Sequence, residues 1–312
     1  MDEKILKIQH TLKKELDENR YHHTLGVMYT SASMAMRYDV DVQKALYAGL
    51  LHDCAKCIPS DKKIRLCEKY GLPVSSVEKE NPSLLHARLG AYLAHEKYGV
   101  KDEEIIYAIE SHTTGRPGMS MLEKIVYIAD YIEPGRRELP NMADVRQLAF
   151  RDIDECLYRI LKDSLVYLDS KNITVDPMTQ RTYDYYKKEM ERRINMDQAK
   201  EMAKIAFEAL EDKKGEDVCA IDISAVSVLA DYFVIANGNS DSQVRALVEN
   251  VEEKMHKAGY AAKETEGHRS GAWVLIDFGD VIVHIFDREN RQFYNLERIW
   301  NDGKKIDDVN EF

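Results

Sequence analysis

The spacing of apolar residues changes near residue 195, and this change most constrains what the chain can fold into. Before it, apolar residues recur every three or four positions, as from Tyr21 to Ala35, which is the spacing of one helix face. Beyond it we expect helices over about 197–211 and 243–257 and strands at 218–222 and 232–236. Runs at 273–278 and 281–286, separated only by Gly279-Asp280, predict a tight hairpin. The pattern predicts an all-α bundle over 1–195 and a small α/β domain with a mixed sheet over 196–312.

Length and charge also favour two domains. A chain of 312 residues is long enough for two cores at about 150 residues each. Residues 1–195 carry 30 Lys and Arg against 31 Asp and Glu, whereas residues 196–312 carry 14 against 24, a net charge of −10. An acidic domain repels a phosphate backbone, so direct DNA binding is not expected, and a basic protein partner suits it better. Solubility alone is the alternative explanation of this charge.

The sequence contains no apolar run long enough to cross a membrane, and its charged start does not resemble a signal peptide. We therefore expect a cytoplasmic protein with no membrane partner. Its five cysteines fit a reducing compartment. Cys54 and Cys57 form a C-x-x-C, which favours structural cysteines over a redox pair or half of a zinc site because no second C-x-x-C follows.

Histidines and aspartates concentrate at five places in the helical half. Imidazole and carboxylate groups from separate helices can converge on a metal site inside a bundle. Neighbouring side chains on a helix point about 100° apart, so His52 can hold one metal while Asp53 bridges to a second, about 3.5–4 Å away. The other histidines of this half have an ordinary core or surface explanation. The candidate ligands are His23 in RYHHTLGV, His52 and Asp53 in LLHDCAK, His86 in LLHARLG, His112 in SHTTGRPG and Asp130 in YIADYIEP.

Several further residues have the chemistry to bind phosphate or a nucleoside near these ligands. Lys56 lies one helical turn from His52 and Asp53, so it can reach the same site and neutralise developing charge, as a catalytic residue beside Asp53. Guanidinium groups bind phosphate oxygens in pairs, and hydroxyl or backbone donors follow the SHTTG helix end. For each of these the alternative is an ordinary surface residue. The candidates are Arg20, Arg116 and Arg136 for phosphate, Thr113, Thr114 and Gly115 as donors, and Tyr131, which either stacks on an adenine or packs.

The order H…HD…H…H…D resembles the HD-domain phosphohydrolase superfamily. The segments RYHHTLGV, AGLLHDCAK, LLHARLGAYLA, SHTTGRPGMS and KIVYIADYIEPGR resemble more closely the YqeK family, which hydrolyses diadenosine tetraphosphate symmetrically to two ADP. The resemblance covers about residues 3–193. It implies a dinucleoside polyphosphate or ADP as ligand and two divalent or mixed-valent metal ions, with iron favoured and manganese or another transition metal compatible. It assigns one ion to His23, His52, Asp53 and Asp130, and the other to Asp53, His86 and His112.

One segment departs from the family pattern. NITVDPMTQRTYDYY keeps Pro177 and Thr179, but the residues after them do not align, so contacts to nucleotide from Arg181 are not assigned. The oligomeric state is equally open, and a homodimer is compatible with the sequence.

The acidic half resembles the ribosomal silencing factor family, RsfS or Iojap. The resemblance rests on ADYFVIANGNSDSQVRALVENVEEKMHKAGY, EGHRSGAWVLIDFGDVIVHIF and RQFYNLERIW, about residues 197–303. It implies a nucleotidyltransferase-like fold without catalytic residues, and binding of the large ribosomal subunit through a basic ribosomal protein, which blocks subunit joining and represses translation. Trp273, Tyr294 and Trp300 are the candidate contacts, with core packing as the alternative for Trp273.

Three functions are compatible with these observations. The first is a bifunctional diadenosine tetraphosphate hydrolase and translation silencer. The second keeps the metal site but acts as an HD-type nucleotidase or cyclic-dinucleotide phosphodiesterase, because one metal site serves many phosphate esters. The third is a ribosome-binding factor whose helical domain only senses nucleotide, which the complete set of six ligand residues disfavours.

Overall fold

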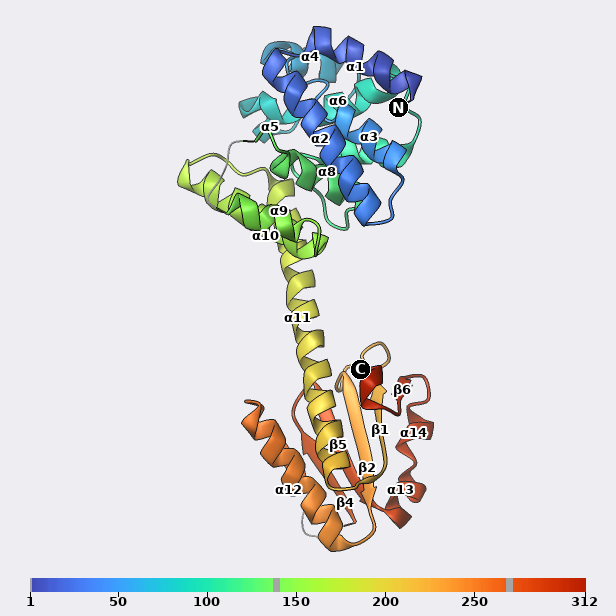
Figure 1. Cartoon of the computed structure of the whole chain (residues 1–312). Helices are drawn as coiled ribbons and strands as arrows, with labels where there is room; N and C mark the ends of the chain where they lie inside the picture. Colours follow the sequence, from blue (N-terminus) through green and yellow to red (C-terminus); the bar gives the residue numbers. More distant parts are fainter. Residues whose placement is uncertain (1, 137–140, 268–271) are drawn as a thin grey trace. The chain divides into compact units, whose positions relative to one another are not determined.

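The computed structural model describes residues 2–136, 141–267 and 272–312. Contacts divide the chain into two units, Met1–Met190 and Glu191–Phe312. Figure 1 shows a helical first unit and a second unit with a sheet and helices. The predicted fold class, a helical bundle followed by an α/β domain with a mixed sheet, is confirmed.

Several helices of the first unit begin at polar residues whose side chains cap the first turn. The side chain of Asp17 accepts a hydrogen bond from Arg20 N at 2.8 Å and so starts the second helix. Ser120 and Glu123 form a reciprocal capping box at the start of α8. The helices are α1 (Glu3–Glu15), α2 (Glu18–Arg37), α3 (Val42–Leu51), α4 (Ser60–Lys69), α5 (Ser76–Glu80), α6 (Leu85–Glu96), α7 (Glu103–Ser111), α8 (Met121–Ile132), α9 (Met142–Leu148) and α10 (Ile153–Ser170), with a 3₁₀ turn at Pro82–Leu84.

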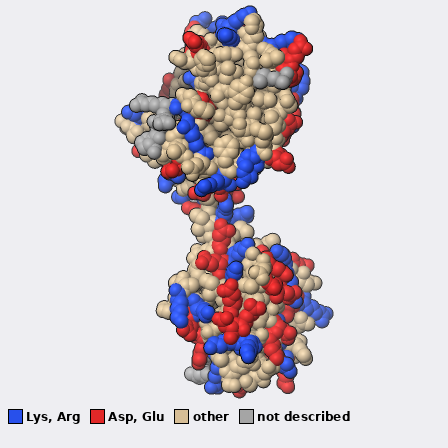
Figure 2. Space-filling model, viewed as in Figure 1, with Lys and Arg blue, Asp and Glu red and all other residues tan. Residues whose placement is uncertain are grey.

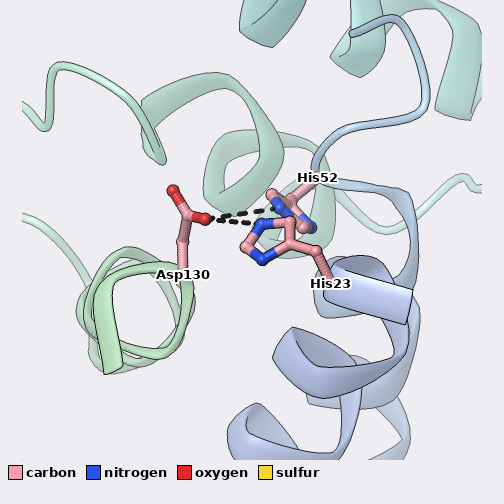
Figure 3. Close-up of side chains that lie close together, drawn as sticks. All are labelled: His23, His52 and Asp130. Carbon is pink, nitrogen blue, oxygen red and sulfur yellow. Dashed lines mark ion pairs between the residues drawn. The ribbon is translucent and has the colours of Figure 1, made fainter. Parts of the chain in front are cut away.

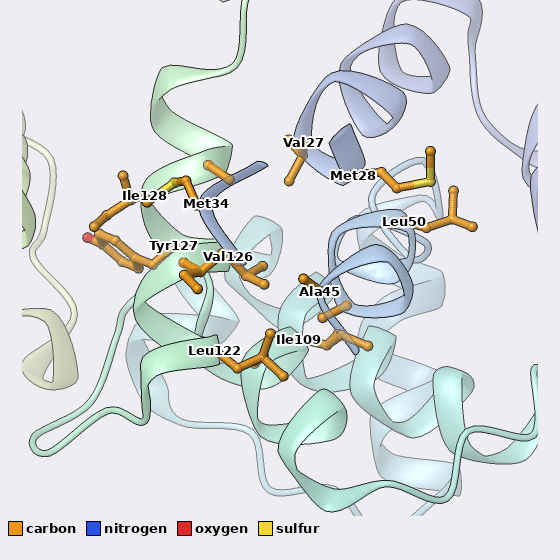
Figure 4. Packing of buried hydrophobic residues seen from close by; sticks show 14 of the residues in the cluster. Val27, Met28, Met34, Ala45, Leu50, Ile109, Leu122, Val126, Tyr127 and Ile128 are labelled. Atoms are coloured by element: carbon orange, nitrogen blue, oxygen red, sulfur yellow. The ribbon is translucent and has the colours of Figure 1, made fainter. Parts of the chain in front are cut away.

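The core of this unit lies between α2, α3, α7 and α8, whose apolar side chains meet in Figure 4. Met28, Leu50, Ile109 and Val126 are fully buried there. A Cβ atom at Gly49 would lie 2.8 Å from Met28 Cα, so α3 approaches α2 more closely than any other residue would permit. This close packing fixes the end of α3, where two candidate ligands follow, against the face of α2.

Helix α11 (Pro177–Asp212) is longer than the helix expected at about 197–211. It begins with a proline at its first position, and the side chain of Asp176 accepts a hydrogen bond from Met178 N at 2.7 Å. No proline or glycine occurs between Pro177 and Asp212, so the helix continues through the point where the contacts divide the chain. Sequence periodicity missed this continuity because the exposed middle of α11 has no apolar face.

The second unit contains a six-stranded sheet in the order β3-β4-β5-β2-β1-β6. Strand β2 pairs parallel to β5, and the other pairs are antiparallel. The predicted hairpin is present, with Asp277 opposite Ile282. The two short edge strands were not predicted, since three residues carry no periodic signal. The strands are β1 (Glu216–Asp222), β2 (Tyr232–Gly238), β3 (Glu264–Glu266), β4 (Trp273–Asp277), β5 (Val281–Asp287) and β6 (Lys304–Ile306).

Helices cover both faces of this sheet, which explains why every residue of β2 is buried. Helix α12 (Asp241–Lys257) and the later part of α11 bury one face, with Phe207 fully enclosed. Helices α13 (Arg288–Tyr294) and α14 (Leu296–Ile299) lie on the other face, where Leu296 and Trp300 meet Phe233. Within the three described ranges, none of the helices has the length and apolar character needed to cross a membrane.

Candidate metal centre

The six candidate ligands come from five helices of the first unit and converge on one buried place. His52 and His112 directly follow α3 and α7 as their C-terminal capping residues, and Asp53 follows His52. His23 lies in α2, His86 at the start of α6 and Asp130 in α8. The four imidazole side chains are at most 10% exposed and the Asp53 side chain 3%, whereas Asp130 is 21% exposed. Asp130 therefore marks the side of the cluster that faces solvent.

One half of the cluster is formed by His23, His52 and Asp130. Figure 3 shows the Asp130 carboxylate pointing from α8 toward both imidazole rings. Oδ1 of Asp130 lies 2.9 Å from His23 Nε2 and 3.7 Å from His52 Nε2. These three ligand atoms lie close enough together to share one metal ion.

Asp53 connects this half to the other. Its Oδ2 lies 3.5 Å from His52 Nε2 and 3.8 Å from His23 Nε2. Its Oδ1 lies 3.1 Å from His86 Nε2 and 3.6 Å from His112 Nε2. The two oxygens of one carboxylate thus face two different pairs of histidines.

A contact at the Nδ1 atom of each histidine orients its ring. Each of these Nδ1 atoms lies against an oxygen that can accept its proton, so Nε2 is the nitrogen available to a cation. The contacts are His52 Nδ1 with Gly49 O at 2.7 Å, His112 Nδ1 with Ile109 O at 2.7 Å, His86 Nδ1 with Ser83 O, and His23 Nδ1 with Glu133 Oε1 at 3.0 Å.

The nitrogen and oxygen atoms that could bind a cation consequently lie close to one another inside the cluster. His86 Nε2 lies 3.0 Å from His112 Nε2, and His23 Nε2 lies 2.9 Å from the carboxylate of Asp130. Among the described residues, buried His23 Nε2, His52 Nε2 and Asp53 Oδ1 have no hydrogen-bond partner. Acceptors at such distances repel each other unless a cation lies between them, so this donor set fits a metal centre.

The electrostatics of the cluster agree with this geometry. Burial lowers the pKa of His86 to about 4, so its ring is neutral, as a metal ligand must be. Burial would raise the pKa of the Asp53 carboxyl, but the imidazoles of His52, His112 and His86 outweigh it and hold that pKa well below its usual range. A neutral His86 ring beside an ionised Asp53 carboxylate is a pair of groups that can bind a cation.

Three basic side chains surround the carboxylates. Arg20 Nη1 lies 2.7 Å from Asp53 Oδ2, and Arg136 Nη2 lies 2.6 Å from Asp130 Oδ1. Lys56 Nζ lies 3.2 Å from His86 Nε2 and 4.0 Å from Asp53 Oδ1. Burial lowers the pKa of Lys56 against the opposing effect of Asp53. The structure thus brings these three predicted residues to the cluster.

The SHTTGR segment divides between the cluster and a neighbouring cavity. Thr113 Oγ1 lies 3.1 Å from His112 Nε2 and 3.2 Å from His86 Nε2. Thr113, Thr114, Gly115 and Arg116 also line a cavity of about 540 Å³. Arg116 is held by Glu123 through Nε and Nη2, both at 2.6 Å, so a phosphate contact by Arg116 requires this ion pair to open.

Sequence reasoning missed two sets of residues around the site. Asp176 and Met178, at the start of α11, line the same cavity as Thr113, so the chain beside Pro177 reaches it. Glu133 binds His23, and its only signal was its place before Pro134 at the end of an aspartate motif. Tyr131 is half-buried against the core, which supports packing rather than adenine stacking.

The C-x-x-C cysteines lie in different environments. Cys54 is buried, with its Sγ 3.5 Å from Gly90 O, and burial raises the pKa of its thiol. Cys57 is exposed, with its Sγ 3.3 Å from Asp17 Oδ2. Both are free thiols in the structure.

Gly115 turns the chain beside the cavity, and we predict that Gly115→Ala destabilises the first unit. Gly115 has φ +63°, a region that costs other residues about 1–2 kcal/mol, and an added Cβ would lie 2.7 Å from Thr182 Cγ2. Gly118→Ala is the control, because Gly118 has φ +65° and its Cβ would meet only Tyr185 Oη at 3.8 Å. Urea denaturation should show a larger loss for Gly115→Ala, and equal losses would contradict the contact with Thr182.

The three aromatic candidates of the second unit differ in exposure. Trp273 is half-buried, stacks on Phe286 and directs Nε1 to His284 Nδ1 at 3.3 Å. Trp300 is half-buried and meets Phe233 edge-on. Tyr294 is 38% exposed, and the adjacent Phe293, which sequence reasoning missed, is 80% exposed.

Comparisons with known proteins agree with the division into two units. Residues 20–135 match the model of the HD domain, and residues 196–312 match the model described as ribosomal silencing factor during starvation. Over 174 residues the chain is 42% identical to the symmetrical bis(5'-nucleosyl)-tetraphosphatase of Bacillus subtilis, covering 56% of this chain and 92% of that protein. Over 108 residues it is 43% identical to the ribosomal silencing factor RsfS of the same organism, covering 35% of this chain and 92% of that protein.

A solved structure supports the first of these relationships. A predicted HD superfamily hydrolase involved in NAD metabolism from Clostridium acetobutylicum is 40% identical, with a TM-score of 0.57. The match covers 59% of this chain and 96% of that chain. The chain therefore belongs to the symmetrical bis(5'-nucleosyl)-tetraphosphatase family of HD-domain hydrolases in its first unit and to the RsfS family in its second, joined in one polypeptide.

Proposed function

We propose that the first unit hydrolyses diadenosine tetraphosphate symmetrically to two ADP at a centre of two metal ions. The observation that carries the proposal is the division of the Asp53 oxygens between two pairs of histidines. In this proposal His23, His52, Asp53 and Asp130 hold one ion, and Asp53, His86 and His112 hold the other. Imidazole and carboxylate ligands suit iron, which the family resemblance favours, and also manganese and other transition metals.

The residues around the ligands have separate tasks in this reaction. When bound, the two ions would polarise a phosphate oxygen and lower the pKa of water. Arg20, Lys56 and Arg136 lie on the accessible side of the cluster, with side chains 27%, 29% and 39% exposed, and would bind the polyphosphate. Lys56, beside Asp53 and His86, would neutralise charge that develops on the departing ADP.

The cavity beside the cluster is our candidate site for one nucleoside. Thr113 belongs both to the cluster and to the cavity wall, so a nucleoside there would be adjacent to phosphates at the ligands. Thr114, Gly115 and Asp176 provide polar groups, and Tyr107 and Met178 provide flat or flexible apolar surface.

Product analysis tests the proposed hydrolysis. The purified chain, supplied with Fe²⁺ or Mn²⁺ and diadenosine tetraphosphate, should release ADP alone, and Asp53→Ala should release none. ATP with AMP would refute the symmetrical reaction. Turnover of a mononucleotide or a cyclic dinucleotide in its place would instead favour the nucleotidase or phosphodiesterase alternatives. Binding of nucleotide without any turnover would favour a sensor.

We further propose that the second unit binds the large ribosomal subunit through a basic protein and represses translation. The proposal rests on the RsfS relationship, on the exposed aromatic pair Phe293 and Tyr294, and on the acidic character of residues 196–312. Figure 2 shows acidic side chains distributed over the visible face of this unit, with lysines and arginines between them. An exposed aromatic anchor within such a surface fits a basic partner.

Removal of the Tyr294 ring should weaken this binding. We expect Tyr294→Ala to raise the dissociation constant for isolated large subunits by about 30-fold or more, the effect of losing an interface anchor worth about 2 kcal/mol. Co-sedimentation measures it. Tyr167→Ala is the control, because Tyr167 is an exposed aromatic residue, 58% exposed, in the other unit. Equal affinities for Tyr294→Ala and the unaltered chain would place the contact elsewhere.

A further inference from the structure

We infer that Glu133 is a positioning residue that orients His23 and strengthens its hold on one of the two ions. The inference rests on the proposed metal centre. Glu133 is the residue that caps the C-terminal end of α8, and its carboxyl side chain is only 3% exposed. Its Oε1 accepts a hydrogen bond from His23 Nδ1 at 3.0 Å, on the side of the ring opposite to the nitrogen that faces Asp130. A carboxylate behind a histidine fixes the ring and makes the ligating nitrogen a stronger donor.

Two glycines leave room for this carboxylate. A Cβ atom at Gly26, one turn after His23 in α2, would lie 2.3 Å from Glu133 Oε2. A Cβ at Gly135 would lie 3.0 Å from the same oxygen, and Gly135 N donates a hydrogen bond to it at 2.6 Å. Pro134, which directly follows Glu133, keeps the Glu133 backbone extended, with ψ 149°. The local sequence therefore builds a cradle that fits a carboxylate and holds it against His23.

His23 is the exception among the four histidines. His52, His86 and His112 lie at helix ends or in the first turn of a helix, where the carbonyl of the third preceding residue can accept the Nδ1 proton. His23 lies within α2, and its Nδ1 donates instead to the carboxylate of Glu133, at the end of α8. The two ends of the cluster are thus unequal, and the ion held by His23, His52 and Asp130 should bind more tightly than the ion held by His86 and His112.

Glu133→Gln tests this inference because an amide has one acceptor oxygen where the carboxylate has two. The substitution leaves either His23 Nδ1 or Gly135 N without its acceptor. We expect the unaltered chain to bind two Mn²⁺ ions, measured by competition with a chelating dye. Glu133→Gln should weaken one of them by about 10–100-fold, the usual effect of removing an outer partner of a metal ligand, and leave the other unchanged.

Glu123→Gln is the matched control. Glu123 is a fully buried glutamate of α8 that binds Arg116. Within the part of the chain that the structure describes, it forms no hydrogen bond or ion pair with any of the six proposed ligands. Its Mn²⁺ affinities should equal those of the unaltered chain. If Glu133→Gln does not fold, as judged by its thermal melt, Gly26→Ala carries the same test, because its methyl group displaces the carboxylate while alanine favours the helix.

The outcomes separate this inference from the proposed reaction. Unaltered Mn²⁺ affinities in a folded Glu133→Gln or Gly26→Ala variant would overturn the role of Glu133, and so would absence of Mn²⁺ binding by the unaltered chain. Two bound ions without hydrolysis of diadenosine tetraphosphate would refute the reaction alone. The comparison of affinities would then still decide the role of Glu133.

Discussion

Substitution of Asp53 by asparagine is expected to weaken both metal ions and to reduce hydrolysis of diadenosine tetraphosphate by more than about 100-fold. Removal of a residue that only hydrogen-bonds to a metal ligand already costs about 10–100-fold in metal affinity. Asp53 is proposed to be a ligand itself, and to be shared by both ions, so its loss should cost more. Asparagine keeps the volume of the side chain but carries no negative charge. It would therefore attract a cation beside His52, His86 and His112 less strongly than aspartate does. The measurement is kcat/KM with saturating Mn²⁺, together with the number of Mn²⁺ ions bound.

Asp154→Asn provides the matched control for this substitution. Asp154 is an aspartate of the same unit, 46% exposed, and pairs with Lys124 at 2.6 Å. Its removal should leave both the bound ions and the rate unchanged. An Asp53→Asn variant that retains two Mn²⁺ ions would show that Asp53 does not bridge them.

Phe207→Ala is expected to destabilise the second unit by about 3–5 kcal/mol while hydrolysis by the first unit persists. Phe207 is a fully buried residue of α11 that contacts Phe312 edge-on and packs under the sheet. Among the described residues, the core of the first unit and the cores of the second share no member. We therefore propose that the two units unfold separately although α11 belongs to both. Calorimetry should show one of two transitions shifted downward.

Met28→Ala is the reciprocal control. Met28 is fully buried in the core of the first unit, so its truncation should lower the other transition and the temperature at which hydrolysis is lost. A single cooperative transition that both substitutions lower equally would contradict separate unfolding.

The sequence predicted those parts of the structure that repeat or that carry strong local signals. Period and turn chemistry predicted the hairpin of β4 and β5 and the helix over about 243–257, and both are confirmed. The mutual distances within the cluster could not be predicted, because they depend on how five helices pack. One example is Gly49, whose missing side chain lets α3 approach α2.

The remaining gaps have physical causes of the same kind. Arg116 has the chemistry of a phosphate ligand, but only the fold shows that Glu123, seven residues later, already binds it. Glu133 was not singled out, because its partner His23 is 110 residues away in the sequence. Residues whose role depends on one distant contact leave no periodic pattern from which to infer that role.

Anomalous diffraction from crystals soaked in Mn²⁺ tests directly whether Asp53 divides the cluster into two cation sites. We expect two manganese peaks, one beside Asp53 Oδ2 with His23, His52 and Asp130, the other beside Asp53 Oδ1 with His86 and His112. A single peak, or two peaks that do not share Asp53, would contradict it.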